Sequence, residues 1–139
     1  MSRLPESAAE LLASDAVGHV VTINEDGSPH VSLAWVSADE SEVVLATLGD
    51  QRKLQNLRRD PRVAISIAGT KVHPPGLKEY LVVYGTARIT EGGAPEMLQE
   101  LARTYLGPDV RFPPMDDPPA GFVTRVTVDR VGGVGPWSS

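Results

Sequence analysis

A basic segment from Gly49 to Pro61 carries the residues best placed for chemistry. It follows the apolar run from Val43 to Leu48, and its pattern predicts a short helix with Arg52 and Lys53 in its first turn. Cations at a helix N-terminus face the positive end of the helix dipole, so a bound anion would reverse an unfavourable arrangement. Free backbone N–H groups and the two side chains could then converge on one phosphate. A solvated basic helix face is the alternative for this segment taken alone.

Composition favours a single domain that binds a small anion. The 139 residues are enough for one domain, residues 1–139, with a buried core. The formal net charge is −5, although five of the 13 basic residues lie between Arg52 and Arg62. One basic cluster on an acidic chain suits a small ligand better than nucleic acid, whose binding proteins usually present a wholly basic face. No signal peptide or membrane-spanning run is present, so we expect a cytoplasmic protein without membrane contact.

Six segments alternate apolar and polar residues with the period of two that is typical of β-strands. Short turns, including an Asp26-Gly27 hairpin signal, separate several of them. The pattern therefore predicts a mainly β domain, an antiparallel barrel with flanking helices over residues 5–12 and 95–106, and a polar turn at residues 37–41. The expected strands cover residues 17–24, 29–36, 42–48, 62–68, 80–90 and 122–131.

The histidines and the first tryptophan look structural. His19 shares a strand face with Val21, so we expect a hydrogen-bonded core histidine, and Trp35 is expected in the core as well. His19, His30 and His73 are far apart in the sequence and lack the spacing of a helical metal pair, so no metal site is predicted. The absence of cysteine also excludes thiolate ligands and a cysteine nucleophile.

No constellation of nucleophile and base is evident in this sequence. A chain with a phosphate cradle but no catalytic constellation suggests that a bound cofactor carries the reaction. The proline-rich stretch of residues 107–119 predicts a packed lid or an interface, because loops of this length are rarely idle. Within it, residues 112–115 are candidates for a wall of the substrate site.

The order of strand, Thr47 and then the segment from Gln51 to Val63 resembles the signature of the pyridoxamine 5′-phosphate oxidase-like split-barrel superfamily. Residues 17–24, 29–36 and 80–87 continue the resemblance. Within the superfamily, the chain is most similar to the actinobacterial branch that uses the deazaflavin coenzyme F420 rather than FMN. The resemblance implies a six-stranded antiparallel split β-barrel. It also implies a homodimer with two cofactor sites in grooves between the subunits.

The resemblance further implies where the cofactor lies. Lys53 matches a lysine that contacts the cofactor phosphate, and either Gln51 or Arg52 matches its neighbouring ligand. Thr47 matches a hydroxyl position beside the phosphate, and Asn56 lines the same turn of the helix. His30, Ser32 and Leu33 match the strand whose backbone edge meets the ring system. Lys78 and Tyr80 correspond to positions of the partner subunit near the cofactor.

This resemblance implies an F420-dependent oxidoreductase that transfers a hydride from the reduced deazaflavin to an electron-poor small-molecule acceptor. An FMN-dependent oxidoreductase would use the same phosphate cradle and is one alternative. A non-catalytic F420 carrier is another. The apolar loop does not identify the natural acceptor, since apolar walls exclude water without selecting one molecule.

Overall fold

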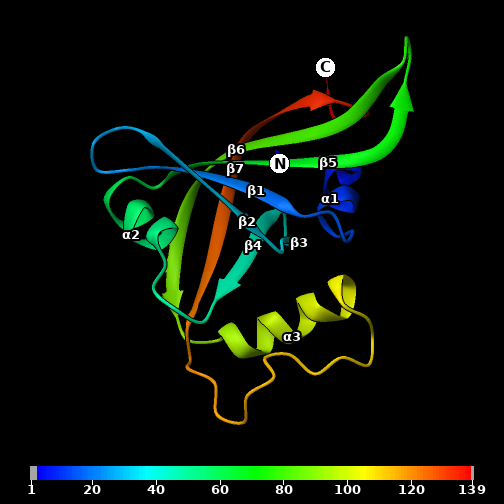
Figure 1. Cartoon of the computed structure of the whole chain (residues 1–139). Helices are drawn as coiled ribbons and strands as arrows, with labels where there is room; N and C mark the ends of the chain where they lie inside the picture. The colour runs from blue at the N-terminus through cyan, green and yellow to red at the C-terminus, as the bar shows by residue number, and fades with distance from the viewer. Residues whose placement is uncertain (1–2, 139) are drawn as a thin grey trace.

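A computed structural model of the chain describes residues 3–138, which form one curled antiparallel sheet with three helices around it (Figure 1). The order of strands in the sheet is β2-β1-β5-β6-β7-β4-β3, so β2 and β3 form its two edges. The strands are β1 (Gly18–Ile23), β2 (Pro29–Ala34), β3 (Ser37–Asp39), β4 (Glu42–Thr47), β5 (Arg62–His73), β6 (Leu77–Glu91) and β7 (Phe122–Val134). The fold is mainly β and of the split-barrel type, as predicted.

The helices cover different parts of the barrel. α1 (Glu6–Leu12) packs against β3 and β5, α2 (Arg52–Arg59) against β1 and β6, and α3 (Ala94–Tyr105) against β4 and β7. Figure 1 shows the loop of residues 107–119 passing beneath α3 before the chain enters β7. None of the helices formed by residues 3–138 has both the length and the apolar character needed to cross a membrane.

The barrel core comes from the inward faces of the strands and from α1. Apolar side chains at alternate positions are almost fully buried there, as the period of two predicted for the later strands. A second, smaller cluster lies between α3, β4 and the loop of residues 107–119. The main core includes Val20, Leu45, Val63, Ile65, Ile67, Leu81, Val83 and Val126.

All six expected strands are present, and a seventh short strand corrects one local prediction. Residues 37–41 were expected to form a polar turn, but Ser37–Asp39 forms β3 and pairs with β4. Only Glu40 and Ser41, which have positive φ angles, make the turn. β5 and β6 also run past their expected ends, so that residues 69–79 form a hairpin arm that projects from the barrel (Figure 1).

The first strand has the opposite phase to the one expected, and this corrects the placement of His19. Gly18, Val20 and Thr22 are buried, whereas His19 lies on the exposed face with Val21. Its Nδ1 atom is 3.3 Å from the carbonyl oxygen of Ser66. Periodicity identifies two alternating faces of a strand but does not say which one meets the core.

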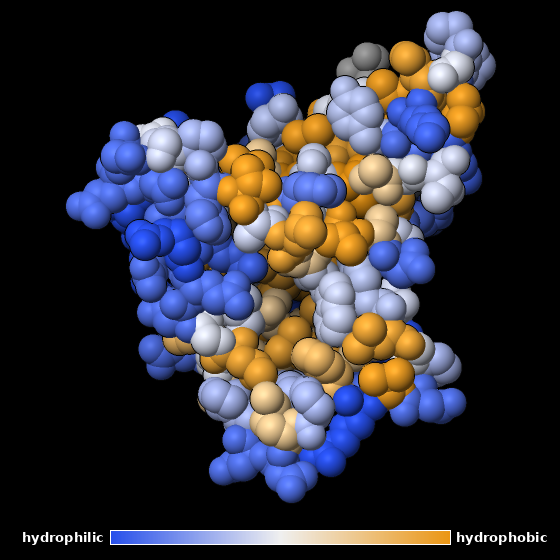
Figure 2. Space-filling model, in the orientation of Figure 1, coloured by the Kyte–Doolittle hydropathy of each residue, from blue (hydrophilic) through white to orange (hydrophobic). Residues whose placement is uncertain are grey.

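The outer face of the sheet is itself apolar over several strands. Val31 and Leu33 of β2 are 60% and 63% exposed. Strand pairing aligns a row of outward side chains across β2, β1, β5 and β6: Val31, Val21, Ala64 and Tyr84. Figure 2 shows apolar residues gathered over this part of the molecule and hydrophilic residues over α2. A continuous apolar face of this kind is a candidate protein interface.

Candidate functional site

Three buried polar atoms have no hydrogen-bond partner in the described part of the chain, two on the edge strand β2 and one at the end of β4. His30 Nδ1, Ser32 Oγ and Thr47 Oγ1 are buried and find no partner among residues 3–138. His30 and Ser32 lie on the inward face of β2, opposite Thr22 and Val20 of β1. Because buried polar atoms are nearly always hydrogen-bonded in native proteins, three such atoms from predicted site residues indicate a ligand position.

Lys53 carries a positive charge on the buried side of α2. Its side chain is on the buried side of α2, and the residue is only 3% exposed. Burial lowers the pKa of the Lys53 ammonium group. None of the ion pairs formed by residues 3–138 includes this residue. A buried lysine without a counter-ion is costly for the protein, and a bound anion would offset that cost.

Asn56 fastens α2 to β1 one turn beyond Lys53. Its Nδ2 atom donates to Thr22 Oγ1 and to Asn24 Oδ1, each over 3.0 Å. Sequence reasoning did not single out Thr22 and Asn24, although polar residues at inward positions of an apolar strand would have been the signal. These hydrogen bonds hold the second turn of α2 against β1 at Thr22, which pairs with His30 across β1 and β2. A contact between Asn56 and a cofactor stays a prediction.

Ion pairing also fixes the loop that leads into α2. Arg58 donates from Nη1 to Asp50 Oδ1 over 2.8 Å, and its guanidinium lies over the ring of Phe122 at 5.2 Å from the centroid. Gln55 Nε2 donates to the carbonyl oxygen of Asp50. The start of α2 is therefore held in place before any ligand arrives, as a binding site for a small anion requires.

The other residues predicted to contact the cofactor are exposed on the surface of the chain. Gln51 is the N-cap of α2 without a side-chain cap hydrogen bond, and both Gln51 and Arg52 are exposed. Leu33 faces outward from β2. Lys78 and Tyr80 are exposed on β6, Lys78 near the tip of the hairpin arm, where it pairs with Val72, and Tyr80 at its base, where it pairs with Ala68. Within one chain, Asn56 is joined to Thr22, which pairs with His30, whereas a common site that also includes Lys53, Thr47 and Ser32, and a role for Lys78 and Tyr80 as partner-subunit positions, stay predictions.

Trp35 occupies the smaller apolar cluster and not the barrel core, which corrects its expected position. Its ring stacks on Tyr105 with centroids 5.3 Å apart and meets Phe112 at 5.0 Å. Phe112 belongs to the proline-rich loop, so this loop is packed against the body of the protein, as expected. The three rings join the end of β2, α3 and the loop into one unit.

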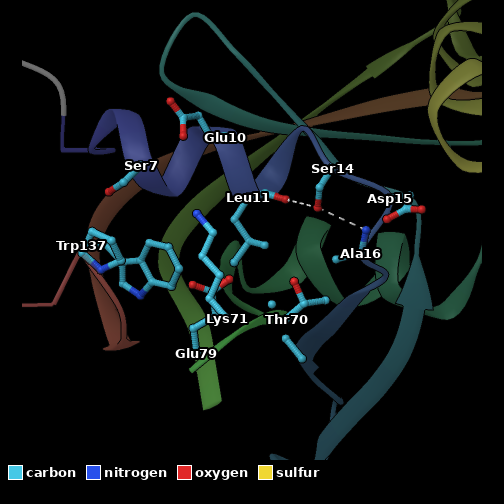
Figure 3. A pocket seen from close by; sticks show the side chains of 13 residues that line it. Ser7, Glu10, Leu11, Ser14, Asp15, Ala16, Thr70, Lys71, Glu79 and Trp137 are labelled. Atoms are coloured by element: carbon cyan, nitrogen blue, oxygen red, sulfur yellow. Dashed lines mark hydrogen bonds between the residues drawn. The ribbon is translucent and has the colours of Figure 1, made fainter. Parts of the chain in front are cut away.

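A cavity of about 300 Å³ lies elsewhere, between α1, the hairpin arm and the C-terminal segment (Figure 3). Its buried polar side chains, Glu79 and the indole of Trp137, are both hydrogen-bonded. Glu79, which is 7% exposed, contacts His73 Nε2 over 3.1 Å, and this hydrogen bond lowers the pKa of the Glu79 carboxyl group. Ser14 Oγ donates to the carbonyl oxygen of Leu11. The cavity includes none of the predicted cofactor residues.

No cluster of three or more histidine, cysteine, aspartate or glutamate side chains within residues 3–138 could hold a metal ion. The candidate site comprises the buried ammonium group of Lys53, the hydroxyl groups of Ser32 and Thr47, the imidazole of His30 and the N-terminus of α2. Such a set suits a phosphorylated organic molecule, with its anionic end at α2 and polar ring atoms along β2.

Comparisons with known proteins agree with this geometry. The family model described as pyridoxamine 5′-phosphate oxidase matches residues 4–135. An F420 reductase of known structure is 26% identical, with a TM-score of 0.71, over 92% of this chain and 98% of that protein. The conserved hypothetical protein Rv2991 from Mycobacterium tuberculosis is 25% identical, with a TM-score of 0.71, over 96% and 84% of the two chains.

A more distant structural neighbour supports the fold alone. HupZ from Group A Streptococcus is 18% identical, with a TM-score of 0.66, over 97% of this chain and 98% of that protein. No curated protein shows a significant match to the sequence.

Proposed function

We propose, since the chain belongs to the pyridoxamine 5′-phosphate oxidase family, that it is a coenzyme F420-dependent oxidoreductase. It would act as a cytoplasmic homodimer and reduce an electron-poor small molecule. The choice of F420 is supported by the F420 reductase among the structural neighbours and by the resemblance of the chain as a whole to the F420-using branch.

The observation that carries the proposal is the group of unsatisfied atoms beside a buried cation. Lys53 and the free N–H groups at the start of α2 would hold the phosphate of the cofactor. The hydroxyl of Thr47 would donate a hydrogen bond to the phosphate end of the cofactor. His30 and Ser32 would hydrogen-bond polar atoms of the ring system along the edge of β2, and each orphaned atom would gain a partner.

When bound, the reduced deazaflavin supplies a hydride to the acceptor. The protein contributes orientation of the two molecules and removal of water from the seam of the barrel. The acceptor must also take up one proton to complete its reduction, and no residue among those described is assigned as the donor. Gln51 and Arg52, both at the exposed start of α2, remain alternative second ligands of the phosphate.

The homodimer is supported by the apolar outer face of the sheet. Val31 and Leu33 are among the most exposed large apolar residues, and the row of Val31 continues across β1 and β5 with Val21 and Ala64. A second copy would remove these side chains from water, which favours association. Lys78 and Tyr80 on the hairpin arm could then reach the cofactor of the other subunit.

Titration calorimetry with F420 and with FMN tests the function directly. We expect F420 to bind and FMN to bind more weakly or not at all. Preferential binding of FMN, or a purified protein with a flavin absorbance spectrum, would favour the FMN-dependent alternative. Tight F420 binding without turnover against activated alkenes, imines or quinones would favour the carrier.

Light scattering tests the homodimer. The substitution Val31→Asp places a charge in the proposed interface and should convert a dimer into a monomer. Leu106→Asp is the matched control, because Leu106 is an exposed apolar residue at the end of α3 and away from that face. A wild-type monomer at micromolar concentration would contradict the proposed assembly.

A further inference from the structure

The chain has two asparagines, Asn24 and Asn56, and their side chains are hydrogen-bonded to each other. Asn24 follows β1 directly, at the start of the turn into β2, whereas Asn56 lies on the buried side of α2. An amide side chain has a donor end and an acceptor end, so it can be placed in two senses that offer a ligand different chemistry. The neighbours of this pair determine which sense each side chain takes.

The turn between β1 and β2 fixes the sense of Asn24. The Asp26 carboxylate accepts from the Ser28 hydroxyl over 2.5 Å and from the Ser28 amide over 3.0 Å. These hydrogen bonds, the hydroxyl one first, lower the pKa of the Asp26 carboxyl group, which is therefore ionised at neutral pH and can only accept. The Ser28 proton is thus committed to Asp26, and the Ser28 oxygen accepts from Asn24 Nδ2 over 3.2 Å.

The sense of Asn24 in turn fixes that of Asn56. With its Nδ2 atom turned to Ser28, Asn24 offers its Oδ1 atom to α2, and Asn56 Nδ2 donates to it over 3.0 Å. The same nitrogen also donates to Thr22 Oγ1 over 3.0 Å. Rotating the Asn56 amide by half a turn would set its oxygen against Asn24 Oδ1 and break both hydrogen bonds. At a residue that is only 1% exposed, this loss is unfavourable.

The Oδ1 atom of Asn56 is the one function that these contacts leave unused. Both Nδ2 protons have acceptors, and Oδ1 takes part in none of the hydrogen bonds formed within residues 3–138. An amide oxygen accepts from hydroxyl and N–H groups, so Asn56 can bind a donor but not an acceptor. Its neighbours belong to the candidate site, because its partner Thr22 is paired with His30, and Lys53 lies one turn earlier on the same buried side of α2.

We propose that Asn56 contacts the ligand as an acceptor only, and that the turn of residues 24–28 fixes it in this sense. Asp26 is then a positioning residue at the surface, which acts through Ser28 and Asn24. Resting on the proposed function, the group that donates to Asn56 is a hydroxyl of the chain that links the phosphate of the cofactor to its ring. Such a contact favours a hydroxylated linker over one that lacks donors, since the latter would leave the amide oxygen unpaired.

Nuclear magnetic resonance of protein with 15N- and 13C-labelled asparagine tests the sense of Asn56, because only two side-chain amides are then observed. Without cofactor, both Asn56 Nδ2 protons should exchange with solvent about tenfold or more slowly than those of an unstructured asparagine. Adding F420 should shift the resonance of the Asn56 side-chain carbonyl carbon and leave the two protons protected. Rapid exchange of both protons in the free protein would overturn the proposal, because the nitrogen and not the oxygen would then be unpaired.

Ser28 offers a matched pair of variants in the exposed turn. Ser28→Ala removes the acceptor of Asn24 Nδ2, which frees the Asn24 amide to rotate. The exchange of the Asn56 protons should become several fold faster, and F420 should bind about two- to tenfold more weakly, the range of one hydrogen bond. Ser28→Thr keeps the hydroxyl group and should restore both values. Unchanged exchange and affinity in Ser28→Ala would overturn the control of Asn56 by the turn.

The choice of coenzyme is tested separately from the role of Asn56. FMN carries a hydroxylated linker as well, so FMN binding in place of F420, with the expected carbonyl shift, would contradict the F420 assignment and support this role. Binding of F420 without a shift of the Asn56 carbonyl carbon would overturn the role and leave the F420 assignment intact.

Discussion

The site around α2 and the cavity beside α1 are opposite cases within one molecule. In the cavity, Glu79 is paired with His73, and the indole Nε1 of Trp137 donates to the carbonyl oxygen of Tyr80. Around α2, Lys53 has no ion pair in the described chain, and three buried polar atoms have no hydrogen bond. Both regions contain buried polar groups, but only those of the candidate site lack hydrogen-bond or ion-pair partners in the described part of the chain.

This difference shows which region is built to receive a ligand. A cavity whose polar groups already satisfy one another gains little from a bound molecule, because the ligand must displace existing hydrogen bonds. A site with orphaned donors and a buried cation stabilises a complementary ligand with each contact. Hollow volume is a poor guide here, since none of the predicted cofactor residues lines the cavity.

The largest expected effect comes from Lys53→Met. The substitution removes the proposed phosphate ligand and should weaken F420 binding by about 1.5–3 kcal/mol, as expected for a hydrogen bond to a charged group. It also removes a buried unpaired charge, so the protein without cofactor should melt at a higher temperature than wild type. Calorimetry and thermal unfolding measure the two effects, which have opposite signs.

Lys71→Met is the matched control for this substitution. Lys71 is exposed and lines the cavity of Figure 3. Its replacement should change neither F420 affinity nor, beyond a few tenths of a kcal/mol, stability. Equal F420 affinity of Lys53→Met and wild type would remove Lys53 from the site and end the distinction between the two regions.

The sequence predicted the strands and helices well because their hydrophobic patterns are strong. Its errors have two physical sources. The phase of β1 was inverted because both faces of the strand carry apolar residues, Val20 on the buried face and Val21 on the opposite one. The strand at residues 37–39 was missed because three residues are too few to show a period.

Much of the candidate site could also be anticipated. The basic helix after Thr47 predicted a phosphate cradle from charge and dipole alone, and the matched family positions added His30 and Ser32. Burial of Lys53 could not be predicted, because a basic residue on a short helix is usually solvated. The contacts of Gln99 with Phe112 and of Tyr105 with Trp35 could not be predicted from the sequence either, since they depend on how the loop of residues 107–119 folds back onto α3.

A second test compares two buried threonines that differ only in their partners. Thr22→Val removes an acceptor of Asn56 Nδ2 and should lower the free energy of unfolding by about 1 kcal/mol. Thr47→Val removes an orphaned hydroxyl from a residue of the same shape, so it should leave stability unchanged or raised. Denaturant unfolding measures both, and a comparable loss of stability in Thr47→Val would show that its hydroxyl already has a partner.

In cofactor binding, we expect the larger effect from Thr47→Val and the smaller one from Thr22→Val. Thr47→Val should weaken F420 binding by about 0.5–1.5 kcal/mol, the net contribution of one hydrogen bond. Thr22→Val acts only through the position of α2 and should have a smaller effect. Calorimetry on the two variants decides whether the orphaned hydroxyl is a ligand position.

The smallest effect is expected at Glu79, in the paired region. Its hydrogen bond with His73 lowers the pKa of the Glu79 carboxyl group from 4.5. Such a group adds stability above its unfolded-state pKa, and this contribution is lost as the pH falls through the lower folded-state pKa. Below pH 4.5, wild type should therefore lose stability more steeply than Glu79→Gln in urea unfolding. F420 affinity should be the same in both, and a decrease in Glu79→Gln would mean that the cavity and the cofactor site are coupled.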